Sequence, residues 1–82
     1  VKIDRTFIGD MLSSAESRSV VQATIDIAHS LGRRAVAEGV EDADTVKLLT
    51  EMGCDHAQGY YFAAAMPINE LLLDLSGKRA AA

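Results

Sequence analysis

The pattern of apolar and polar positions changes period several times along the chain, and each change predicts a new element. Residues 1–4 alternate between apolar and polar side chains, which is typical of a short β-strand. Residues 15–31 carry apolar side chains at spacings of three and four, which predicts an amphipathic helix covering one face of a sheet. The members of this stripe are Val20, Val21, Thr24, Ile25, Ile27, Ala28 and Leu31. Gly32 is the predicted stop, because glycine adopts the left-handed cap conformation without steric cost.

The second half of the chain continues this order of strand and helix. Small apolar residues at 34–38 predict a second strand that ends at Glu38. Asp42 is a predicted N-cap for a helix over 43–52, and Gly53 ends that helix. The remaining expected elements are a strand at 56–61, a helix at 69–75 after the interruption by Pro67, and a flexible tail at 76–82.

Strands separated by helices predict an α/β fold with a parallel sheet, because parallel strands need a crossover connection. The expected order is βαβαβα. Barrels of this type need about 250 residues, whereas this chain has 82 and begins inside a strand-like run without an initiator Met. We therefore expect a piece of a larger fold, with residues 1–75 as the folded part and 76–82 as the tail.

Charge and composition argue against several functions. Eight Lys and Arg residues against twelve Asp and Glu residues give a net charge of −4, which disfavours DNA or RNA binding because no basic patch is available for phosphates. The apolar runs are far shorter than the roughly 20 residues that span a bilayer, and no signal-peptide pattern is present. We therefore expect no membrane contact and a cytoplasmic location. Cys54 is the single cysteine, and its apolar neighbours predict a buried structural thiol.

Several polar residues lie at the ends of the predicted strands. The carboxyl ends of parallel strands meet at one edge of a sheet, so these residues are expected to converge although they are far apart in sequence. They are Lys2, Asp4, Glu38 and Gln58. Carboxylate and amide oxygens are suitable ligands for Mg²⁺, Mn²⁺ or Ca²⁺, whereas no Cys or His spacing typical of zinc occurs. The pattern therefore predicts a site for a hard divalent cation.

Structural interpretations compete with these functional ones. Lys2 alone is typical of a solvated lysine, and Asp4 can simply pair with Lys2 or Arg5. Gln58 can satisfy main-chain groups at a turn. A different functional alternative is an aldolase-like barrel in which Lys2 forms a Schiff base with the substrate.

The imidazoles and the aromatic cluster favour structural roles. His29 and His56 have no paired ligand in the sequence, so we expect neither to bind metal. Tyr60, Tyr61 and Phe62 are expected to lie in the core and at the rim rather than to stack on bases.

Three motifs have the order and spacing of a known family. They are Lys2-Ile3-Asp4-Arg5-Thr6-Phe7, Ala37-Glu38-Gly39-Val40-Glu41 and the ten residues from Gly53 to Phe62. Together they resemble the C-terminal third of EAL domains, the bacterial phosphodiesterases that hydrolyse cyclic di-GMP. The similarity covers residues 1–75, and it implies strands six to eight of a (β/α)₈ barrel with their helices.

The resemblance also implies roles for individual residues. Glu38 resembles a metal-ligating carboxylate, Lys2 the ammonium that binds the attacking water, and Gln58 a residue that orders water on the metal. Asp4 and Glu41 are candidates for the rim of the site, with a purely structural role as an equal alternative for each. The whole domain would hold two Mg²⁺ or Mn²⁺ ions, and most of the ligands of those ions are absent from this chain.

For the whole protein, the resemblance implies cyclic di-GMP as the ligand and attachment to GGDEF or sensory domains. The parent domain is either a phosphodiesterase or a degenerate receptor that binds the dinucleotide or a protein partner without cleaving it. We expect the isolated chain to be inactive, and to be a homo-oligomer because its sheet edges are open. One departure is the pair Ala64 and Ala65, where the family usually has a basic residue and then Pro.

Overall fold

The computed structural model describes residues 1–59 and 62–75. Its elements are β1 (Lys2–Ile3), α1 (Arg5–Asp10), α2 (Ala15–Ser30), β2 (Val36–Val40), α3 (Ala43–Glu51), β3 (His56–Gly59), β4 (Phe62–Pro67) and α4 (Ile68–Leu75). The predicted tail at 76–82 and the expected roles of Tyr60, Tyr61 and the Phe62 side chain fall outside what the structure describes.

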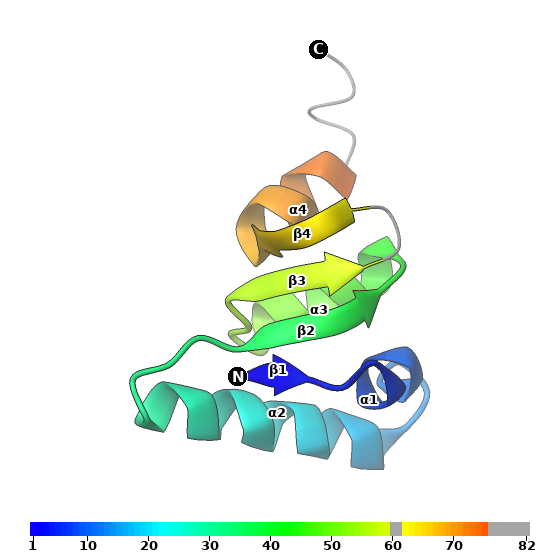
Figure 1. Ribbon diagram of the computed structural model, residues 1–82. Coiled ribbons are helices and arrows are strands. Elements are labelled where there is room, and N and C mark those ends of the chain that lie inside the picture. Colours follow the sequence, from blue (N-terminus) through cyan, green and yellow to red (C-terminus); the bar gives the residue numbers. More distant parts are fainter. Residues whose placement is uncertain (60–61, 76–82) are drawn as a thin grey trace.

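The sheet has the strand order β1-β2-β3-β4 (Figure 1). β1, β2 and β3 are parallel, as the sequence predicts, but β4 runs antiparallel to β3. The expectation of a fully parallel sheet is therefore wrong at β4, because the next described element after β3 is a second strand, which pairs with β3 in the opposite direction, and not a crossover helix. Pro67 ends this strand, where proline is tolerated because one side of an edge strand needs no ladder hydrogen bond.

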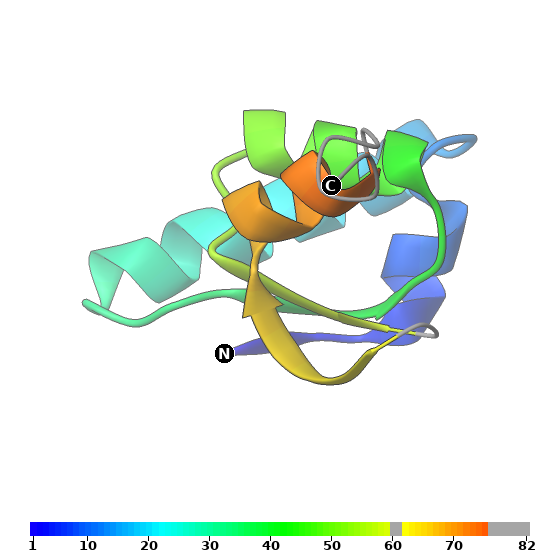
Figure 2. The same cartoon turned by 90° about the horizontal axis from the view of Figure 1, so that it is seen from above.

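The helices α2, α3 and α4 lie on one side of the sheet, and no described helix covers the other side (Figure 2). Side chains alternate between the two faces of a strand. Ile3, Ala37 and Ala57 are register neighbours and are buried in the core that the helices cover. The residues that alternate with them project from the face without helices, which we call the open face.

Helix α2 agrees closely with the predicted boundaries. It begins after Ser14, whose hydroxyl accepts a hydrogen bond from the main-chain N–H of Ser17, and it ends before Gly32, which has a φ of 68°. The buried stripe is narrower than predicted, because the sheet and α1 cover only part of the helix surface. Val21, Ile25 and Ala28 are buried, whereas Val20, Ile27 and Leu31 are 39%, 57% and 63% exposed.

Helix α1 differs from the prediction, because the sequence indicated a polar connection after Phe7 and Ile8. The Asp4 carboxylate accepts a hydrogen bond of 2.7 Å from the main-chain N–H of Thr6, so Asp4 is the N-cap of α1. Ile8 points into the core and is buried. Six residues are too few to show a helical period, which explains why the pattern alone missed this element.

Helix α3 and the thiol beyond it agree with the sequence analysis. Asp42 caps the helix, and its carboxylate accepts a 2.8 Å hydrogen bond from the main-chain N–H of Thr45. Gly53 ends this part of the chain with a φ of 88°. Cys54 is only 3% exposed, and burial raises the pKa of its thiol. Within the described ranges, no helix has the length and apolar character needed to cross a membrane.

Candidate functional site

The pairing of β2 with β3 brings two candidate residues side by side. Glu38 and Gln58 are register partners, so their main chains are separated by one strand spacing of about 4.8 Å. Their neighbours Ala37 and Ala57 are buried toward the helices, so Glu38 and Gln58 project from the open face. Both residues lie in the carboxyl-terminal halves of their strands, which end at Val40 and Gly59, so the candidate site is on the open face near the strand ends.

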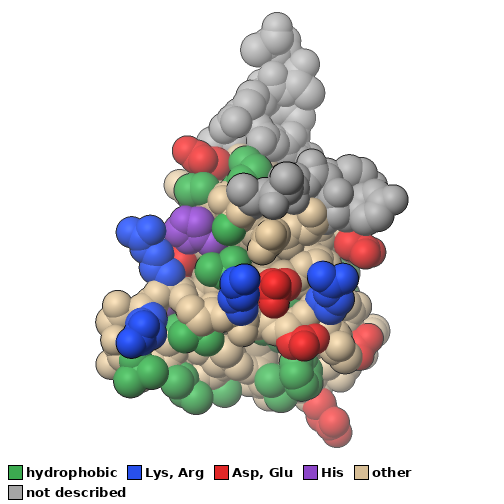
Figure 3. Space-filling view, viewed as in Figure 1, with side chains coloured by type: hydrophobic (Ala, Val, Ile, Leu, Met, Phe, Trp, Pro, Cys, Tyr) green, Lys and Arg blue, Asp and Glu red, His purple; other side chains and the backbone are tan. Residues whose placement is uncertain are grey.

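Lys2 lies on the same open face, one step closer to the strand starts. Its register partner is Val36, two residues before Glu38 on β2. The Lys2 side chain is exposed, and that of Glu38 is half-buried. Figure 3 shows basic and acidic side chains interspersed over the middle of the molecule on this face. The topology thus gathers an ammonium, a carboxylate and an amide from three strands.

The two predicted rim residues are placed differently from each other. The Asp4 carboxylate caps α1, and the hydrogen bond from the main-chain N–H of Thr6 holds the pKa of Asp4 below its ordinary value. Its main-chain carbonyl also accepts from Phe7. Asp4 therefore has a definite structural role, as a cap rather than as the partner of a neighbouring cation. Glu41 is exposed directly after β2 and is not the cap of α3, because Asp42 is.

Two glycines shape the main chain beside Glu38. β2 has a register shift between Glu38 and Val40, and Gly39 in between has a φ of 76°. A β-bulge of this kind needs glycine, because side chains rarely tolerate that conformation. A Cβ atom on Gly59 would overlap the carbonyl oxygen of Val40, and one on Gly39 would lie 2.6 Å from the Cβ atom of Arg5. The bulge thus brings the start of α1 directly against the residue after Glu38.

The oxygen atoms of the candidate site are of the type that a hard cation prefers, but they are too few to complete its coordination. Glu38 offers carboxylate oxygens and Gln58 an amide oxygen, which are ligands for Mg²⁺ or Mn²⁺. Over residues 1–59 and 62–75, no group of three or more His, Cys, Asp or Glu side chains converges as a metal site would require. The described residues therefore offer ligands to a metal centre without forming a complete one.

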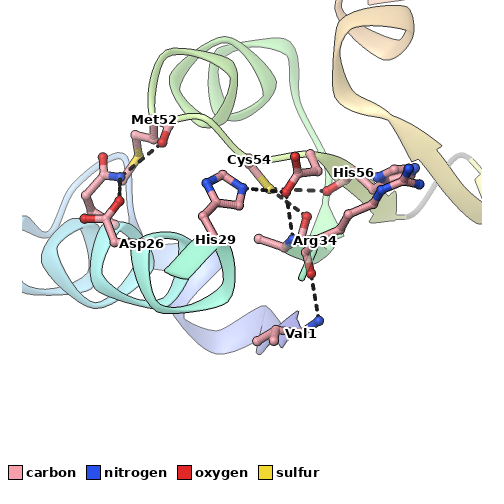
Figure 4. Close-up of polar contacts among 10 residues, drawn as sticks. Val1, Asp26, His29, Arg34, Met52, Cys54 and His56 are labelled. Atoms are coloured by element: carbon pink, nitrogen blue, oxygen red, sulfur yellow. Dashed lines mark hydrogen bonds and ion pairs between the residues drawn. The ribbon is translucent and has the colours of Figure 1, made fainter. Parts of the chain in front are cut away.

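A separate polar cluster lies at the opposite end of the strands, where β2 and β3 begin (Figure 4). The Nε2 atom of His29 on α2 lies 2.7 Å from the carboxylate of Asp55, and the main-chain N–H of Ala35 donates to the same oxygen at 2.8 Å. This pairing agrees with the structural role expected for His29. No local pattern pointed to Asp55, because its partners are 26 and 20 residues away.

Opposing effects act on the Asp55 carboxyl. Partial desolvation favours its protonated form, but the hydrogen bond from Ala35 and the hydrogen bond and charge of His29 outweigh that effect. The net result is a pKa of Asp55 below its ordinary value. The adjacent His56 has a buried Nδ1 atom that finds no hydrogen-bond partner among the described residues.

Comparison with known proteins identifies the family of this arrangement. The family model described as EAL domain matches residues 1–65, which is most of the chain. The chain belongs to the EAL domain family. Two relatives from Pseudomonas aeruginosa carry names that state an activity. The cyclic di-GMP phosphodiesterase PA2567 is 46% identical over 66 residues, covering 80% of this chain. The cyclic di-GMP phosphodiesterase RocR is 40% identical over 77 residues, covering 94% of this chain.

Solved EAL structures share the fold. The PaMucR phosphodiesterase in complex with cyclic di-GMP superposes with a TM-score of 0.71 at 35% identity, covering 87% of this chain and 29% of that one. The α/β class and its assignment to part of a (β/α)₈ barrel are therefore confirmed. This EAL chain spans only 11% of the length of PA2567 and 20% of that of RocR.

Proposed function

We propose that this EAL segment supplies one part of the active site of a metal-dependent cyclic di-GMP phosphodiesterase. The supporting observation is the register of β1, β2 and β3, which puts Lys2, Glu38 and Gln58 on one sheet face without a covering helix among the described residues. In a (β/α)₈ barrel the helices form the outer ring, so the open face of these strands is the one that faces the interior.

Each of the three side chains has a role that its chemistry supports. Glu38 supplies an anionic ligand to Mg²⁺ or Mn²⁺, and Gln58 reaches the same centre through water. Ions held there would supply a water of lowered pKa and would offset the charge of the attacked phosphate. Lys2 holds the nucleophilic water in line through its ammonium group. Asp4 and Glu41 stand at the rim, where Asp4 also fixes the start of α1.

The isolated chain is proposed to be inactive, because Glu38 and Gln58 alone make an incomplete metal centre. A non-catalytic receptor for cyclic di-GMP is the second candidate, and it would apply to a parent domain that lacks the remaining carboxylates. The aldolase-like alternative, in which Lys2 forms a Schiff base, is not proposed, because the chain belongs to the EAL domain family. Because the relatives are several times longer than this chain, we also propose a parent protein with GGDEF or sensory domains.

The test uses a complete barrel in which residues 1–75 of this chain replace the matching segment of a cyclic di-GMP phosphodiesterase relative. We call this protein the chimeric barrel. Glu38→Gln should abolish most conversion of cyclic di-GMP to the linear dinucleotide, with partial rescue at high Mn²⁺. Lys2→Ala should lower kcat by about 10²- to 10⁴-fold, the usual scale for a positioned catalytic group. Both groups act mainly on the transition state, so substrate binding should change less than turnover.

His29→Gln is the matched control, because His29 lies at the opposite edge of the sheet. Full activity of the Glu38→Gln chimeric barrel would contradict the catalytic proposal. Binding of cyclic di-GMP without cleavage, in a barrel whose other carboxylates are intact, would favour the receptor function instead.

A further inference from the structure

Arg5 is held in one place beside the candidate site. Asp4 caps α1, so the helix starts at Arg5 immediately after β1 ends. The main chain of Gly39 lies directly against the Cα and Cβ atoms of Arg5, since a Cβ on Gly39 would lie 2.6 and 3.4 Å from the Arg5 Cβ and Cα atoms. Gly39 is covalently next to Glu38. The root of the Arg5 side chain is therefore fixed one residue from the proposed metal ligand.

The other described cationic side chains are not placed in this way. Arg18 is engaged with the carbonyl of Met11, to which its guanidinium donates at 2.9 Å. Arg33 and Arg34 precede β2 at the opposite edge of the sheet, and Lys47 lies on α3. Among the described residues, Lys2 and Arg5 are thus the cations rooted beside the Glu38 carboxylate.

These two cations flank Glu38 along β2. Lys2 is level with Val36, and Arg5 is level with Gly39. Three residues of strand separate these levels, which corresponds to about 10 Å of main chain. The Arg5 side chain is exposed, and its first atoms lie beside Gly39 near the carboxyl end of β2.

We propose that Arg5 binds the second, non-reacting phosphate of a cyclic dinucleotide substrate. This proposal rests on the proposed phosphodiesterase function and extends it to substrate selection. A cyclic dinucleotide carries two phosphodiester groups, and only one of them is attacked in a turnover. In that proposed function Lys2 and Glu38 serve the reacting phosphate, and the second phosphate carries a negative charge that a further cation can bind. A guanidinium suits that task, because its planar donors match a phosphate group in a bidentate manner.

The test compares Arg5→Ala and Arg5→Lys in the chimeric barrel with the wild-type segment. A contact that is the same in the ground state and the transition state changes KM but not kcat. Arg5→Ala should therefore raise KM for cyclic di-GMP by about 10- to 100-fold, the scale of a charge-assisted hydrogen bond, with kcat nearly unchanged. Arg5→Lys should recover part of the loss. Arg33→Ala removes the same charge at the opposite edge and is the matched control.

A second substrate separates phosphate binding from a structural role. Bis(p-nitrophenyl) phosphate has only the reacting phosphodiester, so Arg5→Ala should leave its kcat/KM unchanged. An equal loss on both substrates would show that Arg5 merely holds α1 in place, and an unchanged KM for cyclic di-GMP would also refute the proposal.

Calorimetric binding of cyclic di-GMP distinguishes this inference from the proposed function. The wild-type chimeric barrel could bind cyclic di-GMP without cleaving it while the Arg5→Ala variant fails to bind it. That result would support the Arg5 contact and refute the catalytic proposal. Cleavage by the wild-type chimeric barrel, with unchanged cyclic di-GMP binding in Arg5→Ala, would support the catalytic proposal and refute the Arg5 contact. A wild-type chimeric barrel that neither binds nor cleaves would refute both.

Discussion

Asp55 accepts hydrogen bonds from two separate elements, the His29 imidazole of α2 and the main-chain N–H of Ala35 ahead of β2. Its own main-chain carbonyl accepts from the N–H of Ile68 at the start of α4. One residue therefore ties two helices to the edge of the sheet where β2 and β3 begin. The hydrogen bonds that the carboxylate accepts favour its ionised form.

Replacement of Asp55 should change how stability depends on pH. The folded pKa of Asp55 lies below its ordinary value, so the ionised carboxylate stabilises the fold above about pH 4. That contribution is lost as the pH falls through the folded pKa. Asp55→Asn should lower the free energy of unfolding at neutral pH and make the decline of stability in acid shallower.

The measurement is urea unfolding, monitored by circular dichroism at several pH values and one protein concentration. Asp10→Asn is the matched control, because the Asp10 side chain is exposed and its carboxylate makes no hydrogen bond to the described residues. Parallel stability curves for wild type and Asp55→Asn would contradict the assigned role of this carboxylate.

At the residue scale, contacts between neighbouring strands could be predicted from the sequence, whereas contacts between a helix and a distant segment could not. Glu38 and Gln58 were expected together because a parallel sheet aligns its strands, and the register bears this out. The contact of Arg5 with Gly39 and the pairing of His29 with Asp55 join residues that are 34 and 26 positions apart. No local pattern encodes such contacts, since they depend on how helices settle on the sheet.

Helix starts in this chain are fixed by short polar side chains. Asp4, Ser14 and Asp42 each accept a hydrogen bond from a main-chain N–H in the first turn of the helix that they precede. Such a bond satisfies a donor that the helix itself leaves unpaired. These caps set the boundaries of α1, α2 and α3, and the start of α3 was correctly predicted from Asp42 alone.

Removal of the Asp42 cap should destabilise the chain measurably. Asp42→Ala deletes the acceptor for the main-chain N–H of Thr45 and should cost about 1 kcal/mol in free energy of unfolding. Asp42→Asn keeps an acceptor oxygen and should retain most of the stability. Chemical denaturation of the three proteins side by side provides the measurement, and equal losses in both variants would argue against a capping role.

At the element scale, prediction failed where tertiary contacts outweigh local preference. The alanines at 63–65 show no strand pattern, yet they belong to β4 because the chain folds back on β3. Helix α1 is short and depends on its cap and on the burial of Ile8. Long elements with a clear period, such as α2, were predicted within one residue of their observed ends.

The whole molecule leaves several surfaces without a covering element. β1 is an edge strand, and the sheet has no described helix on its open face. Large apolar side chains are also exposed on α1, α2 and the segments beside them; they are Val1, Phe7, Leu12, Val20, Ile27 and Leu31. Exposed strand edges and apolar patches favour association with another chain.

We therefore expect the 82-residue chain to associate with itself in solution. Multi-angle light scattering should give a mass above the 8.8 kDa of one chain, increasing with protein concentration. The double variant Ile27→Glu and Leu31→Glu should shift the population toward the monomer while its circular dichroism remains helical. A stable monomer of the wild-type chain at all concentrations would refute this expectation.

The placement of Gln58 beside Glu38 depends on the correct register between β2 and β3. A slip of β3 by a single residue would turn Gln58 toward the helices and present Ala57 or Gly59 beside Glu38. Such a misfolded barrel would keep its helical content and much of its apolar burial, and spectroscopy would barely distinguish it. In the chimeric barrel, the proposed turnover would distinguish it, so specific activity per folded molecule would report the fraction of chains whose strands are correctly aligned.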